Sequence, residues 1–235
     1  ENARYCTSGG VVRLYPPELP QTSPHMMIDA LDVAFERLQR SAVDTGAIGA
    51  IKLDAMQHGS VYLSEAFQGA LSGLSGESTL LPQLEGCFSR DSVPIWEDRT
   101  TAKEAEDITQ ALADSGGVDA LTGNRAELRF PAAQLLKWAR QEPAAYERTA
   151  HIQLLSAFLT SLVAGSLAPV DTGDGWGTNL NNLDISSPDW SSPVVEALNR
   201  LLDEAGCSGD LRGKLGNIAE YDAGVGQIAP YFAER

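Results

Sequence analysis

The chain has few of the residues from which metal and redox sites are usually built. It contains three cysteines and three histidines in 235 residues. No CxxC pair occurs, and no cysteine–histidine cluster has the spacing of zinc ligands, so the sequence predicts no structural zinc site. The cysteines, Cys6, Cys87 and Cys207, are widely spaced and odd in number, which is typical of free thiols in a reducing compartment. We therefore expect a cytoplasmic protein.

Long apolar runs and positive charge are also scarce. The most apolar window, LLSAFLTSLVAGSLAP, falls short of a bilayer span and contains serine and threonine, so it predicts a buried helix. The chain has 17 basic and 32 acidic residues, a net charge of −15. Such a field repels nucleic-acid phosphates and anionic lipids, and we expect neither as a partner. A neutral substrate needs no compensating charge.

Several common catalytic motifs are missing. The sequence has no GxxxxGK[ST], no GxSxG and no HExxH, which excludes a P-loop, a nucleophile elbow and a zincin site. The segment DTGDGWGTNLNN resembles a calcium loop only briefly. Glycine occupies its third and fifth positions and the glutamate at the twelfth is missing, so an EF-hand is rejected.

What is present fits one large α/β domain. Hydrophobic residues make up 43% and charged residues 21% of the chain, an ordinary globular balance. Ser23 and Pro24 predict the start of a helix with Met27, Leu31 and Phe35 on one face. The next segment, GAIGAIKLDA at 46–55, is predicted to form a strand. A strand that follows an amphipathic helix is typical of α/β domains.

Further helices are predicted downstream. Thr101 and Glu104 suggest a capping box at the start of a helix, and prolines at 131 and 143 suggest the start and an interruption of another. A buried helix is expected around 154–163. The polar, glycine-rich segment that follows it, APVDTGDGWGTNLNNLDISSPDW, is too long for a simple turn and is therefore a candidate functional loop.

His58 is the first candidate binding residue, because Gln57 and His58 stand where the predicted strand ends. Ligands of α/β sheets bind at such strand ends. An amide and an imidazole together supply donors and acceptors, which suits neutral hydroxyls. A lone histidine beside apolar sequence more often satisfies a backbone group, so from the residues alone a sugar or polyol site and a structural role stay equally open.

Arg129 and the segment PIWEDRTT are the other candidates. Arg129 immediately precedes a predicted helix, and an ion pair with an acid such as Glu127 is its ordinary interpretation. Trp96 with Asp98 nearby could hold a sugar, since an indole covers C–H faces while a carboxylate accepts from hydroxyls. A buried tryptophan followed by solvated charges is equally compatible with these residues. In the glycine-rich loop, ligand and turn roles both stay open for Asp174, Trp176 and Asn179.

The order of these motifs is more specific than any one of them. MQHGSVYL, PIWEDRTT, LTGNRAELRFPAAQLLKW, DTGDGWGTNLNN and GQIAPYFAER together resemble the N-terminal domain of the FGGY carbohydrate kinases. Within that family the pattern most resembles the xylulokinases. The resemblance runs from about Ile28 to Arg235.

The resemblance implies an actin-like, ribonuclease-H-like α/β fold in a two-domain sugar kinase. Residues 1–235 would be the N-terminal, sugar-binding domain, incomplete at both ends, without the C-terminal nucleotide-binding domain. The implied reaction transfers the γ-phosphoryl group of ATP, with Mg²⁺, to a ketose hydroxyl, foremost from D-xylulose to D-xylulose 5-phosphate. The family's habit implies a homodimer.

The resemblance also implies site residues. His58 and Arg129 would contact the sugar, and Gln57 and the segment from Trp96 to Asp98 would line the same pocket. The family's general base is an aspartate in a Gly-Asp-Asn segment that follows APYF, and its phosphate loop is Asp-x-Gly-Thr. This sequence has neither, so we assign no catalytic residue and expect this chain alone to be inactive.

The strand before QHG departs from the xylulokinase pattern. Lys52 and Asp54 stand where xylulokinases often have small residues. Substrate choice therefore stays open toward ribulose, another ketose or a glycerol-like polyol. Because the base and the phosphate loop are missing, a non-catalytic sugar-binding module also stays open.

Overall fold

The computed structural model describes residues 3–14, 19–207 and 210–234. Both ends of the predicted 1–235 domain, Glu1 and Arg235, lie outside the described residues. The α-helices are α1 (Pro24–Gln39), α2 (Ala66–Ser72), α3 (Leu80–Gln83), α4 (Ala102–Ala111), α5 (Val118–Thr122), α6 (Pro131–Gln141), α7 (Pro143–Glu147), α8 (Leu155–Ala164), α9 (Thr172–Gly175), α10 (Ser192–Glu204), α11 (Leu211–Leu215) and α12 (Pro230–Ala233). The 3-10 helices are η1 (Ala3–Tyr5), η2 (Thr45–Ala47) and η3 (Ala113–Ser115). The strands are β1 (Val12–Leu14), β2 (Leu19–Thr22), β3 (Ser60–Leu63), β4 (Val93–Pro94), β5 (His151–Leu154), β6 (Val170–Asp171) and β7 (Ile218–Ala219).

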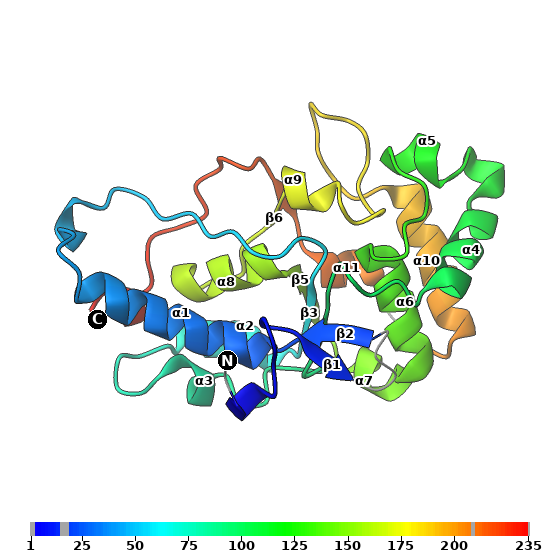
Figure 1. Cartoon of the computed structure of the whole chain (residues 1–235). Coiled ribbons are helices and arrows are strands. Elements are labelled where there is room, and N and C mark those ends of the chain that lie inside the picture. The colour runs from blue at the N-terminus through cyan, green and yellow to red at the C-terminus, as the bar shows by residue number, and fades with distance from the viewer. Residues whose placement is uncertain (1–2, 15–18, 208–209, 235) are drawn as a thin grey trace.

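The strands form three small sheets. Strands β1, β2 and β4 pair in that order and antiparallel, β3 pairs antiparallel with β5, and β6 pairs parallel with β7. Ser60 faces Leu154 and Leu63 faces His151 across the β3–β5 pair. Figure 1 shows this pair in the middle of the molecule, with α1 and α8 toward one end and α4, α6 and α10 toward the other.

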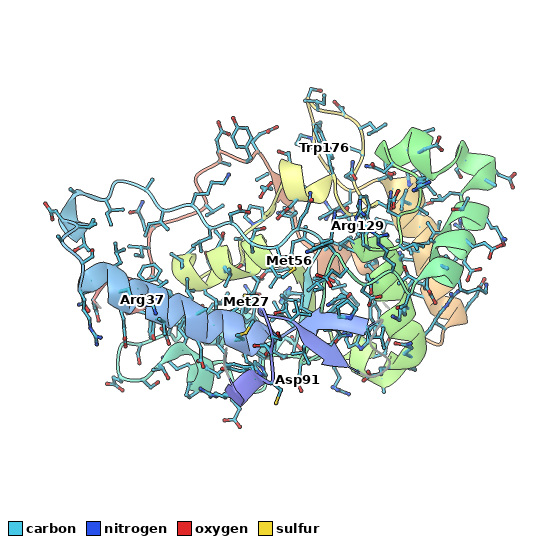
Figure 2. All side chains as sticks on the ribbon, in the orientation of Figure 1. Met27, Arg37, Met56, Asp91, Arg129 and Trp176 are labelled. Carbon is cyan, nitrogen blue, oxygen red and sulfur yellow. The ribbon has the colours of Figure 1, made fainter. Side chains whose placement is uncertain are left out.

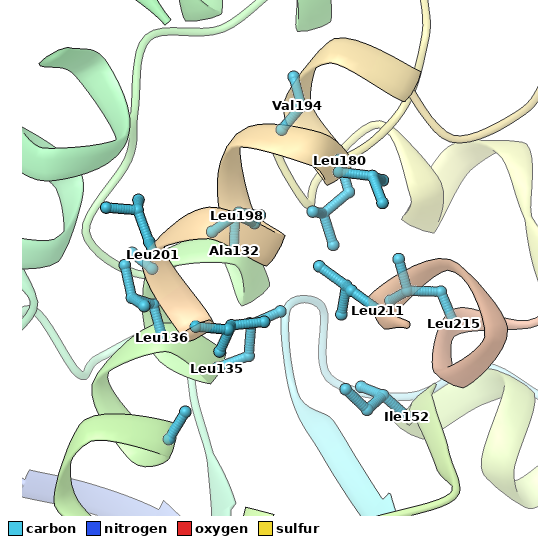
Figure 3. Packing of buried hydrophobic residues seen from close by; sticks show 14 of the residues in the cluster. Ala132, Leu135, Leu136, Ile152, Leu180, Val194, Leu198, Leu201, Leu211 and Leu215 are labelled. Carbon is cyan, nitrogen blue, oxygen red and sulfur yellow. The ribbon is translucent and has the colours of Figure 1, made fainter. Parts of the chain in front are cut away.

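Strand β3 separates two hydrophobic cores. Successive side chains of a strand point to opposite faces. Tyr62 accordingly joins a cluster with residues of α6 and α10, part of which is seen in Figure 3. Val61 and Leu63 join a second cluster with residues of α1, α2 and α8. All three side chains are fully buried. The four-residue strand therefore anchors both halves of the molecule, and it begins two residues after His58.

The predicted helices are confirmed. Helix α1 begins at Pro24, and the Ser23 hydroxyl accepts a hydrogen bond from the Met26 amide at 3.4 Å. Prolines begin α6 and α7, and the apolar window forms the buried α8. Within the described ranges, no helix is long and apolar enough to cross a membrane.

The predicted strand over 46–55 is wrong. After η2 the backbone has no regular structure until the turn at Gln57 and His58, and Ile48 and Ile51 are 37% and 42% exposed. A strand needs a neighbouring strand to complete its hydrogen bonds, and within the described residues no strand pairs with this segment. His58 therefore precedes a strand instead of ending one. The Lys52 ammonium, which belongs to the segment predicted as a strand, donates to the Tyr221 carbonyl.

The predicted capping box is also wrong. Thr101 is the N-cap of α4, but its side chain makes no cap hydrogen bond and donates to the Leu128 carbonyl instead. Glu104 turns to Arg140, with 3.4 Å between Oε1 and Nη1. The local sequence is compatible with a capping box, but Thr101 and Glu104 interact instead with Leu128 and Arg140, which are distant in the sequence. One result is that the start of α4 holds the segment just before Arg129.

Candidate functional site

The backbone and ring of His58 are held on several sides. Its φ angle is 68°, in the left-handed region that residues other than glycine seldom occupy. The residue is 7% exposed. Its Nδ1 lies 2.8 Å from the Gly177 carbonyl oxygen, and its ring centroid lies 4.6 Å from that of Phe130. The imidazole is therefore fixed in one orientation by two segments far away in the sequence.

The surroundings of His58 favour the neutral form of its ring. Burial is the largest influence and lowers the pKa of the imidazole below its ordinary value of 6.5, and the positive charge of Arg129 acts in the same direction. The hydrogen bond to Gly177 and the charge of Glu127 oppose them, without reversing the direction. A neutral imidazole has one donor and one acceptor nitrogen, which suits a hydroxyl ligand.

The lowered pKa of His58 predicts loss of stability in mild acid. The unfolded chain, with the ordinary pKa of 6.5, binds the proton more readily than the folded chain. The free energy of unfolding should therefore fall as pH decreases below about 6.5 and level off below the folded-state pKa. Burial lowers the pKa of His151 in the same way. Urea unfolding between pH 7.5 and about 5 should thus give a shallower decline for His58→Asn than for the wild type. Parallel curves would contradict the assignment.

Arg129 lies near enough to His58 for its charge to act on the imidazole. The predicted partner Glu127 pairs with Arg125 instead, with 2.6 Å between Nε and Oε1. No ion pair joins Arg129 to an acid among the described residues. The guanidinium carbon lies 5.9 Å from the Phe130 ring centroid, so it shares that ring with His58. Figure 2 shows Arg129 in the middle of the molecule, between the two helical ends.

Asn179 ties the glycine-rich loop to the segment that carries Arg129. It is 2% exposed and has a left-handed φ of 58°. Its Oδ1 accepts from the Glu127 amide at 3.1 Å, and its Nδ2 donates to the Thr122 hydroxyl and the Arg125 carbonyl, both at 3.1 Å. The sequence left a ligand role and a turn role open for Asn179, and these contacts favour a structural role. Sequence reasoning had one usable signal, since asparagine tolerates left-handed backbone better than most residues.

Gln57 lies beside the same loop. Its side chain is exposed, and a Cβ atom built on Gly177 would come within 3.2 Å of its Nε2. Trp176, the residue before Gly177, is 37% exposed, and its carbonyl accepts from Asn124 at 3.4 Å. The structure thus brings together Gln57, His58, Arg129 and the loop at Trp176–Gly177. Figure 2 labels Met56, Arg129 and Trp176, which mark these three segments.

Trp96 and Asp98 differ strongly in exposure. Trp96 is 46% exposed, whereas Asp98 is fully buried. The Asp98 carboxylate accepts from the Thr100 amide at 2.9 Å and the Thr100 hydroxyl at 2.6 Å, and it lies 3.5 Å from the Lys137 ammonium. Gln134 donates to the carbonyls of both Asp98 and Leu128, at 3.2 and 3.3 Å. The Asp98 turn is thereby fastened to the residue before Arg129, so that it supports the segment carrying the guanidinium.

A large cavity lies elsewhere in the structure. It has a volume of about 900 Å³ and is lined by α1, α8, residues 45–53 and residues 219–228. Neither His58 nor Arg129 lines it. Among the residues that the structure describes, no group of three or more His, Cys, Asp or Glu side chains could hold a metal ion. The residues around His58 offer neutral and cationic hydrogen-bond donors and acceptors.

Comparison with known proteins relates the chain to sugar kinases. No family model matches it. It is 35% identical over 230 residues to the xylulose kinase of Rattus norvegicus, covering 97% of this chain and 41% of that protein. It is 36% identical over 214 residues to D-xylulose kinase A of Aspergillus niger, covering 89% and 36%. The chain therefore spans about two fifths of the length of these relatives.

A solved structure agrees with this relationship. The xylulose kinase from Rhodospirillum rubrum superimposes with a TM-score of 0.71 over 95% of this chain and 39% of that one, at 17% identity. The fold is thus the actin-like, ribonuclease-H-like α/β fold of the FGGY sugar kinases, as expected from the motifs. The resemblance to xylulokinases that the motifs suggested is confirmed by these relatives, since the chain is homologous to part of the xylulose kinases.

Proposed function

We propose that the chain is the sugar-binding domain, residues 1–235, of a kinase that phosphorylates D-xylulose with ATP to give D-xylulose 5-phosphate. The observation that carries the proposal is the 35% identity to a xylulose kinase across 97% of the chain. The chain's small-molecule partner would be the neutral ketopentose, which the net charge of −15 does not repel. A cytoplasmic location and a homodimer remain predictions.

The sugar would lie against His58 and Arg129. The neutral imidazole supplies an acceptor and the guanidinium supplies donors, so together they match hydroxyl and carbonyl oxygens of a ketose. Gln57 and the exposed Trp96 would line the same pocket with an amide and an apolar ring face. The buried Asp98 would serve this pocket by holding the Thr100 turn and the Leu128 segment.

ATP would supply the phosphoryl group, and a divalent cation, expected to be Mg²⁺, would neutralise its charge. We assign neither group to residues of this chain. The described residues contain no group of acids and histidines able to hold a metal ion, and the sequence lacks the phosphate loop and the Gly-Asp-Asn base of the family. The chain's own contribution is to bind and orient the sugar, and no catalytic residue is assigned.

The test is an assay of the product of the open reading frame that encodes this chain. ADP release is followed with D-xylulose, D-ribulose and glycerol as acceptors. D-xylulose should have the highest kcat/KM. A higher value for D-ribulose or glycerol would instead support a kinase for another ketose or a polyol, which the Lys52 and Asp54 departure leaves open. Sugar binding without ADP release from any acceptor would support a non-catalytic binding module.

A further inference from the structure

The hydrogen bond between His58 and Gly177 determines which ring nitrogen carries the proton. The Gly177 carbonyl oxygen, 2.8 Å from Nδ1, can only accept. Nδ1 must therefore be the protonated nitrogen. In the neutral form of the ring, which burial favours, Nε2 then has a free lone pair. Two charged groups influence the ring's charge, Arg129 and Glu127, and their effects oppose each other.

Gly177 sits too close to His58 for any side chain. A Cβ atom built on Gly177 would lie 2.9 Å from Cε1 and 3.0 Å from Nδ1 of His58, and 3.2 Å from Nε2 of Gln57. Such distances force the neighbour to move. The imidazole is also backed by Phe130, so a displaced ring would lose the carbonyl or the ring contact. Glycine at this position therefore allows the carbonyl and the imidazole to meet.

The loop holds the Gly177 carbonyl in place from both sides. The Gly177 amide donates to the Asp174 carbonyl at 3.0 Å, and the Thr178 amide donates to the Gly175 carbonyl at 3.2 Å. The Thr178 carbonyl accepts from the Ala132 amide at 3.1 Å, at the start of α6. The same helix follows directly after Arg129 and Phe130. The carbonyl is thus built into the framework that carries the rest of the site.

We propose that Gly177 is a positioning residue that fixes His58 in the Nδ1–H tautomer, so that Nε2 accepts a hydrogen bond from a hydroxyl group of the ligand. The ligand part of this inference rests on the proposed sugar-binding function. Arg129 can only donate. The two side chains therefore recognise different oxygens. The imidazole Nε2 needs an oxygen that carries a proton, whereas the guanidinium can donate to an oxygen with or without a proton. A ligand hydroxyl can donate a hydrogen bond to Nε2 of His58, whereas a carbonyl oxygen or an unprotonated phosphate oxygen cannot.

The tautomer can be read directly by long-range ¹H–¹⁵N correlation spectra of the ¹⁵N-labelled chain near pH 7.5. We expect His58 to show a protonated Nδ1 and an unprotonated Nε2. His58→Asn identifies the signals by removing them. A protonated Nε2, or an imidazolium at this pH, would overturn the inference, and the wild-type spectrum alone decides this point.

Gly177→Ala tests the positioning role, with Gly175→Ala as the matched control. A Cβ on Gly175, in the same loop, would make only ordinary contacts, the nearest being Ile218 Cδ1 at 3.5 Å. Gly177→Ala should convert the His58 signals to a mixture of tautomers and raise the Kd for D-xylulose about tenfold, the effect of one hydrogen bond. Gly175→Ala should keep the wild-type tautomer and a Kd within about twofold. An unchanged His58 tautomer in Gly177→Ala would refute the positioning role.

A sugar titration separates this inference from the proposed function. D-xylulose should shift the Nε2 signal of His58, and an analogue with the contacted hydroxyl replaced by hydrogen should not. If the free chain shows the Nδ1–H tautomer but no sugar shifts Nε2, the sugar-binding proposal fails while the positioning of His58 by Gly177 stands. If D-xylulose binds to a chain whose His58 is protonated on Nε2, the positioning inference fails while the sugar-binding proposal stands.

Discussion

His58→Asn should lower kcat/KM for D-xylulose by about 100-fold in the product of the open reading frame, a loss of about 2.7 kcal/mol of transition-state binding. The variant removes the Nε2 acceptor, so that the proposed sugar contact of the imidazole is lost while the donors of Arg129 remain. Asparagine is preferable to alanine because it tolerates the left-handed backbone at φ 68°. The loss should therefore report on the ring and not on backbone strain. The ADP-release assay measures it, with thermal unfolding as a check on folding.

The matched control is His25→Asn. His25 lies in α1 and packs edge-on against Phe88, and it also contacts Tyr5 and Asp91. Its replacement should change kcat/KM by less than about twofold, as for substitutions away from a site. Near-normal turnover of His58→Asn would show that the imidazole does not contact the sugar. An equal loss in both variants would point to a general effect of removing histidine.

Asp98→Ala should destabilise the chain by about 3–5 kcal/mol, because it leaves a largely buried ammonium without its counter-ion. The side chains of Asp98 and Lys137 are 1% and 11% exposed, and Nζ lies 3.5 Å from Oδ2. The variant also removes both acceptor contacts to Thr100. Urea unfolding measures the loss. Adding Lys137→Met to Asp98→Ala should restore part of the stability, since an apolar pair leaves no unpaired charge.

The same experiment separates two roles for Asp98. The family resemblance implies that it lines the sugar pocket, whereas its burial and its contacts with Thr100, Lys137 and Gln134 favour a structural role. A loss below about 1 kcal/mol, as for a replaceable surface group, together with abolished sugar binding would make Asp98 a sugar ligand. A large loss of stability, with sugar binding retained in the double variant, would make it a structural residue.

Much of the fold was predictable where local signals agree with tertiary contacts. Proline at the first turn located α1 and α6, and the apolar window located α8, because each of these features acts within one helix. The segment 46–55 failed for the opposite reason. Its isoleucines and alanines suit a strand, but a strand also needs a partner backbone, which no local pattern supplies. Thr101 failed similarly when the Leu128 carbonyl replaced the local cap.

The site was only partly predictable. The motifs singled out Gln57, His58 and Arg129, and the structure gathers these three. It was the contacts of the glycine-rich loop that the sequence could not reveal. Asn179 reaches back to Thr122 and Glu127, and Gly177 reaches back to His58, across separations of 52 to 119 residues. Such partners become visible only when the chain is folded, so the sequence marked the glycine-rich loop as a whole but did not single out Gly177 within it.

The position of β3 between the two hydrophobic cores bears on how the molecule comes apart. Tyr62 packs with Trp138 at a ring distance of 4.4 Å in one core, while its neighbours Val61 and Leu63 fill the other. If either core unfolds, strand β3 is disturbed, and the side chains that β3 contributes to the other core are disturbed with it. Heat or denaturant should therefore unfold both ends in a single all-or-none transition, and the imidazole at the strand's entrance should lose its orientation only at that midpoint.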